Sequence, residues 1–164
     1  MWCTVMAAAA LAGAPNSSAA AGVPDACSLL SKAEVEAAVH RTVLAPARES
    51  VFNFSICRYG DPQIPPEKLE PSPIVSVNVL VGGMEERFPG FPKEAKDTFE
   101  MMKKSATGPR PIAALGEDAY WESSRRELVI LRGKYLIAIK LQPDSGDQPA
   151  AKILATKALE RLPR

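Results

Sequence analysis

The sequence predicts a single α+β domain, a sandwich in which about three helices pack on a mostly antiparallel sheet. Apolar residues recur at helical spacing in three segments and alternate as in strands in five others. These elements follow one another in the order α-β-β-α-β-β-β-α. A chain of 164 residues, 46 % of them apolar, has the size of one domain and can form one core.

Residues 1–20 predict a signal peptide or a disordered leader, which leaves residues 21–164 as the α+β domain. The leader has no charged side chain, and an apolar run from Val5 to Leu11 precedes a possible cleavage motif at Ser18–Ala20. No Lys or Arg precedes that run, so a disordered tail on a cytosolic protein is the alternative. The run is too short for a transmembrane span. Ala14 stands where a lipoprotein would carry its acylated cysteine, which favours export to a secreted or periplasmic location without a lipid anchor.

The first helix of the domain is predicted to begin at Ser31 and to end near His40. Ser31 and Glu34 have the spacing of a capping box, in which each side chain accepts a hydrogen bond from the other residue's backbone. Apolar residues within 35–39 recur at helical spacing and indicate the face that is buried.

Two strands are predicted next, at residues 52–57 and 74–81. In the first strand, alternation places Cys57 on the face opposite Phe52 and Phe54. Either the first helix packs on the Cys57 face, or a bulge changes the register, and the alternation does not choose between them. Residues 60–73 are a proline-rich connection without a predicted element.

The second half of the chain is predicted to contain two helices with three short strands between them. Pro92 stands where a helix begins, and an apolar stripe at helical spacing continues to Ala106. The last helix, at residues 148–162, has the most regular apolar spacing in the chain. Gly116 is expected to make a tight turn before the strands. The strands are expected at 119–122, 127–131 and 135–141, joined by hairpin turns.

The composition argues against several kinds of chemistry. His40 is the single histidine, so catalysis of the Ser-His-Asp or Cys-His kind and the usual zinc ligand sets are not predicted. Adjacent acids at 85–86 and 117–118 are interpreted as solvated loop residues. The net charge of +1, from 20 basic and 19 acidic residues, predicts neither nucleic acid nor an anionic membrane as a partner. We therefore predict no catalytic residue, no cofactor and no metal site.

Four residues are a candidate recognition patch: Tyr120 and Trp121 in one predicted strand, and Arg125 and Arg126 in the turn that follows. Trp, Tyr and Arg dominate the residues that carry binding energy at protein interfaces. The alternative is that the two aromatic residues belong to the core, as aromatic residues in strands usually do.

Cys27 and Cys57 are predicted to form a disulfide bond. If the leader is removed, Cys3 leaves with it, and the remaining two cysteines form an even pair in an exported domain. Two buried thiols in a cytosolic protein are the alternative. A closed loop of about 30 residues stabilises a fold by roughly 3 to 4 kcal/mol in the chain-entropy model.

Several short motifs resemble a known family: "ACSLLSKAEVEAAV" from Ala26, "CRY" from Cys57, "ALGEDAYW" from Ala114 and "LVILRGKYLIAIKL" from Leu128. They resemble small exported bacterial domains that open with C-S-L-L-T-x-x-E-V, the family of domains of unknown function numbered 3558. The resemblance implies an envelope or secreted location and paired cysteines, and it brings no known activity.

We therefore expect an exported, non-enzymatic binding or accessory domain of the bacterial envelope, whose partner is an unknown protein or envelope ligand. The alternatives are an inhibitor-like protein that blocks a secreted hydrolase, and an enzyme that uses carboxylates, tyrosines and lysines.

Overall fold

The computed structural model describes residues 22–64, 73–85 and 88–163. Within them it confirms an α+β fold, with a seven-stranded sheet and four helices. The predicted leader and most of the proline-rich connection lie outside the described residues. The helices are α1 (Ala26–Leu29), α2 (Lys32–Val39), α3 (Ala95–Ser105) and α4 (Gln148–Arg161). The strands are β1 (Ala47–Val51), β2 (Phe54–Tyr59), β3 (Val75–Val81), β4 (Arg110–Pro111), β5 (Asp118–Glu122), β6 (Glu127–Arg132) and β7 (Tyr135–Leu141).

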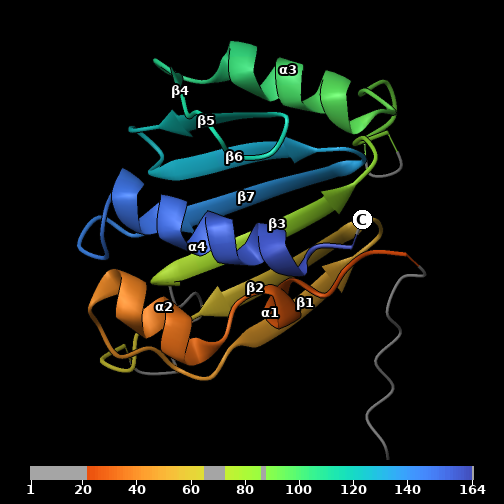
Figure 1. The fold of residues 1–164 in the computed structure, drawn as a ribbon. Helices are drawn as coiled ribbons and strands as arrows, with labels where there is room; N and C mark the ends of the chain where they lie inside the picture. Colours follow the sequence, from red (N-terminus) through yellow and green to blue (C-terminus); the bar gives the residue numbers. More distant parts are fainter. Residues whose placement is uncertain (1–21, 65–72, 86–87, 164) are drawn as a thin grey trace, which may run out of the picture.

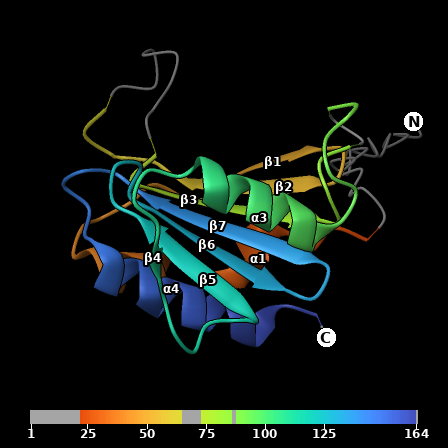
Figure 2. The same ribbon diagram turned by 90° about the horizontal axis from the view of Figure 1, so that it is seen from above.

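The strands form one antiparallel sheet in the order β1-β2-β3-β7-β6-β5-β4. Helices α1, α2 and α4 lie on one face of this sheet and α3 lies on the other (Figures 1 and 2). The larger core fills the space under α1, α2 and α4, and a smaller core lies under α3. Both faces of the sheet therefore pack against helices, and the core under α3 is the smaller of the two.

The valines of β3 show how the alternating pattern sorts side chains between the two cores. Val75, Val77 and Val79 are fully buried in the larger core. The alternate residues Ser76, Asn78 and Leu80 point to the α3 face, where Leu80 joins the smaller core and Asn78 is half-buried. Strand periodicity alone produces this division, because successive side chains point to opposite faces.

Strand β1 is not predicted from the sequence, and its presence corrects the first predicted strand. The side chains of Ala47–Ser50 are exposed, so no apolar alternation marks them. Pairing of Val51 with Phe54 leaves Phe52 and Asn53 as the turn of a hairpin. Phe52 has a φ of 53° and is 61 % exposed, whereas it was expected inside a strand. Backbone pairing with β2, and not side-chain burial, holds this edge strand in the sheet.

The predicted disulfide between Cys27 and Cys57 is confirmed, with 4.9 Å between the two Cα atoms. Cys57 points from β2 into the larger core, on which the predicted first helix, α2, also packs, so the first of the two alternatives holds and no bulge is needed. Cys27 lies in α1, a single turn that was not predicted. Asp25 caps this turn by accepting a hydrogen bond from the backbone N–H of Cys27. The disulfide thus joins α1 to the second strand.

Local signals for α2, α4 and the turn at Gly116 are confirmed. Ser31 and Glu34 form the capping box, and His40 ends α2 in the left-handed conformation. Gly116 has a φ of +61°, and a Cβ atom there would lie 2.3 Å from the carbonyl oxygen of Leu131. The close approach of the β6 backbone therefore requires a glycine at this turn.

Helix α3 begins at Ala95, three residues after the start that Pro92 predicts. The carbonyl oxygen of Pro92 accepts hydrogen bonds from the backbone N–H groups of Met84 and Glu85, at 2.8 and 3.2 Å. Because that oxygen is bonded to the preceding loop, the first helical hydrogen bond forms later, from Thr98 to Glu94.

Candidate functional site

The four residues of the predicted recognition patch do not share one surface. Tyr120 and Trp121 are 1 % and 3 % exposed and point to opposite faces of β5. Tyr120 packs against Phe99 of α3, with 5.4 Å between ring centroids, while Trp121 lies in the larger core. Both rings are therefore core residues, which is the alternative considered above. Arg125 is exposed and Arg126 is half-buried, and both reach a groove on the α3 face.

On the α3 face, side chains form rows that cross the sheet, because directly paired residues of neighbouring strands point to the same side. The first row is polar and contains Arg58, Ser76, Lys140 and Glu127. The second row contains Ile56, Asn78, Ala138 and Val129. The third row is apolar and contains Phe54, Leu80, Leu136 and Leu131. This face therefore changes from charged to apolar along the strands.

Helix α3 covers only part of these rows. It packs on β6 and β7, and its Phe99 is fully buried against the smaller core. Toward β2 the rows are less covered, and Ile56, Asn78 and Ala138 are only half-buried. We call this part of the α3 face, over β2, β3 and β7, the open face.

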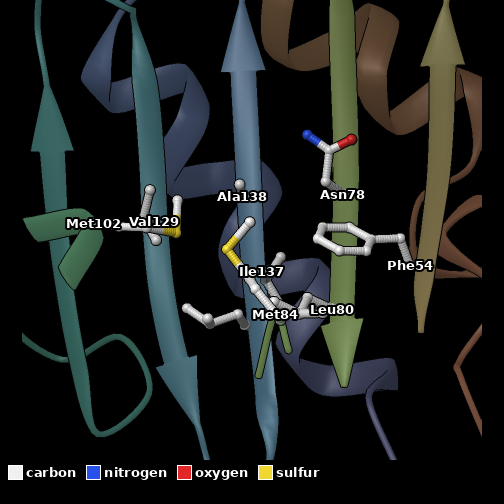
Figure 3. A pocket seen from close by; sticks show the side chains of 9 residues that line it. Phe54, Asn78, Leu80, Met84, Met102, Val129, Ile137 and Ala138 are labelled. Atoms are coloured by element: carbon white, nitrogen blue, oxygen red, sulfur yellow. The ribbon is translucent and has the colours of Figure 1, made fainter. Parts of the chain in front are cut away.

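The apolar end of the open face holds a hollow of about 90 Å³. Figure 3 shows the ring of Phe54 reaching from β2 over β3, with Met84 in front of β7 and Met102 beside Val129. Methionine side chains are flexible and polarisable, so they adapt to apolar ligands of different shape. The hollow is lined by Phe54, Asn78, Leu80, Met84, Met102, Val129, Leu136, Ile137 and Ala138.

The polar end of the open face is a groove of about 820 Å³. Its described lining has four cationic side chains, from Arg58, Arg125, Arg126 and Lys140, and one carboxylate, from Glu127. The other residues that line it are Pro73, Ser76, Asn78, Ser124, Leu141, Gln142 and Pro143. Because Asn78 lines both spaces, the groove and the apolar hollow meet at this residue.

Two of the four cations already have carboxylate partners. Arg58 forms an ion pair with Glu49 of β1, and Arg125 lies 3.6 Å from the buried carboxylate of Glu122. That carboxylate also accepts hydrogen bonds from the backbone N–H of Thr107 and from the Ser124 hydroxyl.

The other two cations, Arg126 and Lys140, make no ion pair within 4 Å among the residues that the structure describes. The Nε atom of Arg126 is buried, and no described group accepts its hydrogen bond. The backbone of Arg126 has a φ of 53°. Its carbonyl oxygen accepts a hydrogen bond from the backbone N–H of Leu141, which fixes the position of the turn next to β7. The described lining of the groove therefore has four cations to one carboxylate, and the Lys140 ammonium makes no ion pair within 4 Å with a described residue.

Glu127 is the carboxylate of the groove, and its pKa is raised. Burial raises the pKa most; the charges of Lys140 and Arg125 lower it, and the charge of Glu122 raises it. Glu122 is paired with Glu127 directly across β5 and β6. Protonation of Glu127 is therefore easier than that of a solvated glutamate, and a protonated side chain would leave the groove more positive.

The sequence did not single out Arg58, Ser76, Asn78 or Lys140. Ser76, Asn78 and Lys140 are the polar positions of otherwise apolar strands, so alternation could have placed them on one face. It could not have shown that α3 leaves this part of the face uncovered. The turn that carries Arg125 and Arg126 was predicted, and the structure adds the strands that complete the groove.

No described group of His, Cys, Asp and Glu side chains is placed to hold a metal ion. Within residues 22–64, 73–85 and 88–163, no helix is long and apolar enough to cross a membrane. Comparisons with protein-family models, curated proteins and solved structures find no match for this chain. The resemblance to the family of unknown function therefore stays a prediction.

Proposed function

We propose that this protein is an exported, disulfide-bonded binding domain of the bacterial envelope, which holds its ligand on the open face without turnover. The observation that carries the proposal is the adjacency of an apolar hollow and a basic groove, which share Asn78 as a lining residue on one face of the sheet. Binding sites combine an apolar surface with a few polar groups that orient the ligand.

The open face has the rigidity that a binding site needs. Its floor is formed by β3 and β7, which are each paired on both sides within the sheet. Sites on regular elements hold their side chains more precisely than sites on loops. The opposite face of the same strands is packed in the larger core, which fixes their position.

The disulfide between Cys27 and Cys57 supports export. Structural disulfides form and persist in oxidising compartments such as the periplasm and the cell exterior, and they are rare in the cytosol. Removal of the predicted leader would leave the two bonded cysteines and no other cysteine in the sequence.

The proposal is tested by measuring which components of an envelope extract the protein retains, with and without a substitution that blocks the open face. Ala138 is half-buried in the second row, so Ala138→Tyr would fill the junction of hollow and groove. Ala37→Tyr is the matched control, because Ala37 is exposed on α2 on the opposite face. Disulfide-intact proteins would be immobilised, exposed to envelope extract, and analysed by mass spectrometry of bound lipids, small molecules and proteins.

We expect at least one component that wild type and Ala37→Tyr retain and that Ala138→Tyr loses, with circular dichroism showing that all three proteins are folded. A secreted hydrolase as that component would identify the inhibitor alternative. Equal retention by all three proteins, or no retained component, would contradict the proposal that the open face binds.

A carboxylate-based enzyme is a second candidate that one observation favours. Glu127 lies in the groove with a raised pKa and has Glu122 across the strand pair, and general acids commonly have raised pKa values. The two functions respond differently to Glu127→Gln. A binding domain keeps its ligand in this variant, whereas an enzyme keeps its ligand and loses turnover of it.

A further inference from the structure

We infer that the ligand class of the open face is a single-chain anionic amphiphile, with a carboxylate or phosphate head in the basic groove and an alkyl chain in the apolar hollow. This inference rests on the proposed function and names the chemistry of its ligand. The adjacency of the two spaces and the charge of the groove carry it.

The anionic head of the ligand is inferred from the cations that line the groove. Lys140 is exposed and makes no ion pair within 4 Å with a described residue, whereas Arg126 also lines a second pocket beside Trp121 and Asp147 and has a buried Nε. Guanidinium and ammonium groups bind carboxylate and phosphate oxygens through charge-assisted hydrogen bonds. An anionic head in the groove would accept hydrogen bonds from the Lys140 ammonium, and the positive lining of the groove would favour its charge.

Asn78 supplies a further donor at the junction. Its Oδ1 atom lies 3.3 Å from the Ser76 hydroxyl, which donates a hydrogen bond to it. The amide nitrogen therefore points the other way, and Figure 3 shows it on the side of β7. A head group that reached from the groove toward the hollow would pass this N–H₂ group.

The alkyl chain of the ligand is inferred from the length of the open face and from the apolar side chains on it. The distance along β2 from the polar row at Arg58 to the apolar row at Phe54 is four residues, or about 13 Å. This length suits an extended alkyl chain of about eight to ten carbons, of which only the far end would enter the hollow of about 90 Å³. Phe54, Met84 and Ala138 present apolar surface along it.

An alkyl chain fits this floor better than an acidic peptide does. Strands β3 and β7 are paired on both sides, so their backbone groups are already hydrogen-bonded within the sheet. A peptide lying along the apolar rows would bury its own N–H and C=O groups without partners, which is costly. An alkyl chain has no such groups.

Four probes separate the head from the chain in the disulfide-intact protein: octanoate, octyl phosphate, octyl glucoside and acetate. Octyl glucoside has the same chain with an uncharged head, and acetate has the carboxylate without the chain. Affinity would be measured by NMR titration below the micellar concentration of each probe. We expect octanoate or octyl phosphate to bind at least tenfold more tightly than both controls, and the comparison of the two identifies the preferred head. Amide signals of Asn78, Arg126 and Ala138 should shift.

A pair of lysine substitutions tests the placement of the head. Lys140→Gln should weaken binding of the preferred anionic probe at least fivefold and leave the affinity for octyl glucoside unchanged. Lys152→Gln is the matched control, because Lys152 is an exposed lysine of α4 on the opposite face, and it should change neither affinity.

Several outcomes would overturn the inference. Equal binding of octanoate and acetate would indicate a simple anion site, and equal binding of octanoate and octyl glucoside would indicate an apolar site without head recognition. Binding of an acidic peptide such as tetraglutamate, with no binding of any octyl probe, would assign a peptide instead. If no octyl probe binds while Ala138→Tyr still abolishes retention of an extract component, the ligand class is wrong and the proposed function stands.

Discussion

Arg161, the last residue of α4, forms two hydrogen bonds of 2.7 Å with the carboxylate of Glu34 in the first turn of α2. Glu34 also accepts a hydrogen bond from the backbone N–H of Ser31, which closes the capping box. Arg161 donates in addition to the carbonyl oxygen of Leu29, at the end of α1. The Glu34 carboxylate therefore caps α2 and joins it to α4, and the Arg161 guanidinium joins α4 to both α1 and α2.

We expect Glu34→Gln to lower the melting temperature at neutral pH and to matter little in strong acid. Gln can still complete the capping box, but it cannot form the ion pairs with Arg161 and Lys157. The hydrogen bond from Arg161 is the main cause of the lowered pKa of Glu34. A lowered carboxyl pKa stabilises the fold above the ordinary value of 4.5, and this contribution is lost as the pH falls below it.

Thermal melts of wild type and Glu34→Gln at pH 7 and pH 3 check this expectation. The difference in melting temperature should be larger at pH 7. An equal difference at both values would show that Glu34 acts through packing and not through its charge.

Replacing Cys27 and Cys57 together by Ala should lower the free energy of unfolding by about 2 to 5 kcal/mol. The bond holds α1, a single turn that has little stability of its own, against β2. Hydrogen exchange should therefore become faster first in residues 26–40. Denaturant unfolding measures the loss, and reduction of the wild-type protein should reproduce it. Alkylation of two thiols in the native, unreduced protein would contradict the bonded state.

Trp121→Ala and Arg125→Ala should differ sharply in stability. Trp121 is buried in the larger core, and removal of such a side chain costs about 3 to 5 kcal/mol. Arg125 is exposed, and the buried Glu122 carboxylate keeps two hydrogen bonds without it, so loss of the ion pair should cost about 1 kcal/mol or less. Urea unfolding measures the free energy of unfolding of each variant relative to wild type. Similar losses would show that Arg125, too, has a structural role.

Glu127→Gln should stabilise the fold at neutral pH. Burial is the main cause of the raised pKa of Glu127, so its ionisation costs stability as the pH rises through the range above 4.5. Gln is uncharged at every pH and avoids this cost. The gain should disappear below 4.5, where Glu127 is protonated in both the folded and unfolded states.

Melts of wild type and Glu127→Gln at pH 7 and pH 4 measure this effect. The melting temperature of Glu49→Gln is the comparison. Glu49 is exposed on the edge strand and this variant loses its ion pair with Arg58, so it should not stabilise the fold at pH 7. A loss of stability in Glu127→Gln at pH 7 would contradict the expectation, since it would mean that the charge of Glu127 favours the fold.

The sequence by itself determined the elements that depend on neighbours along the chain. The capping box at Ser31, the apolar stripe of α4 and the turn at Gly116 are specified within a few residues, and each is confirmed. The disulfide was predicted because two cysteines remained after the leader was set aside, and the alternation in β2 left two orientations for Cys57. The structure chose between them through the position of α1.

Tertiary structure alone decided β1, the burial of Tyr120 and Trp121, and the open face. Strand β1 is exposed and carries no apolar pattern, so it exists through pairing with β2. The basic groove combines Arg58 of β2 with Lys140 of β7, which lie in one row because both are paired with Ser76 of β3. Side-chain periodicity records which residues share a face of one strand. It does not record strand order or how far a helix extends over the sheet, because both depend on contacts between residues distant in sequence.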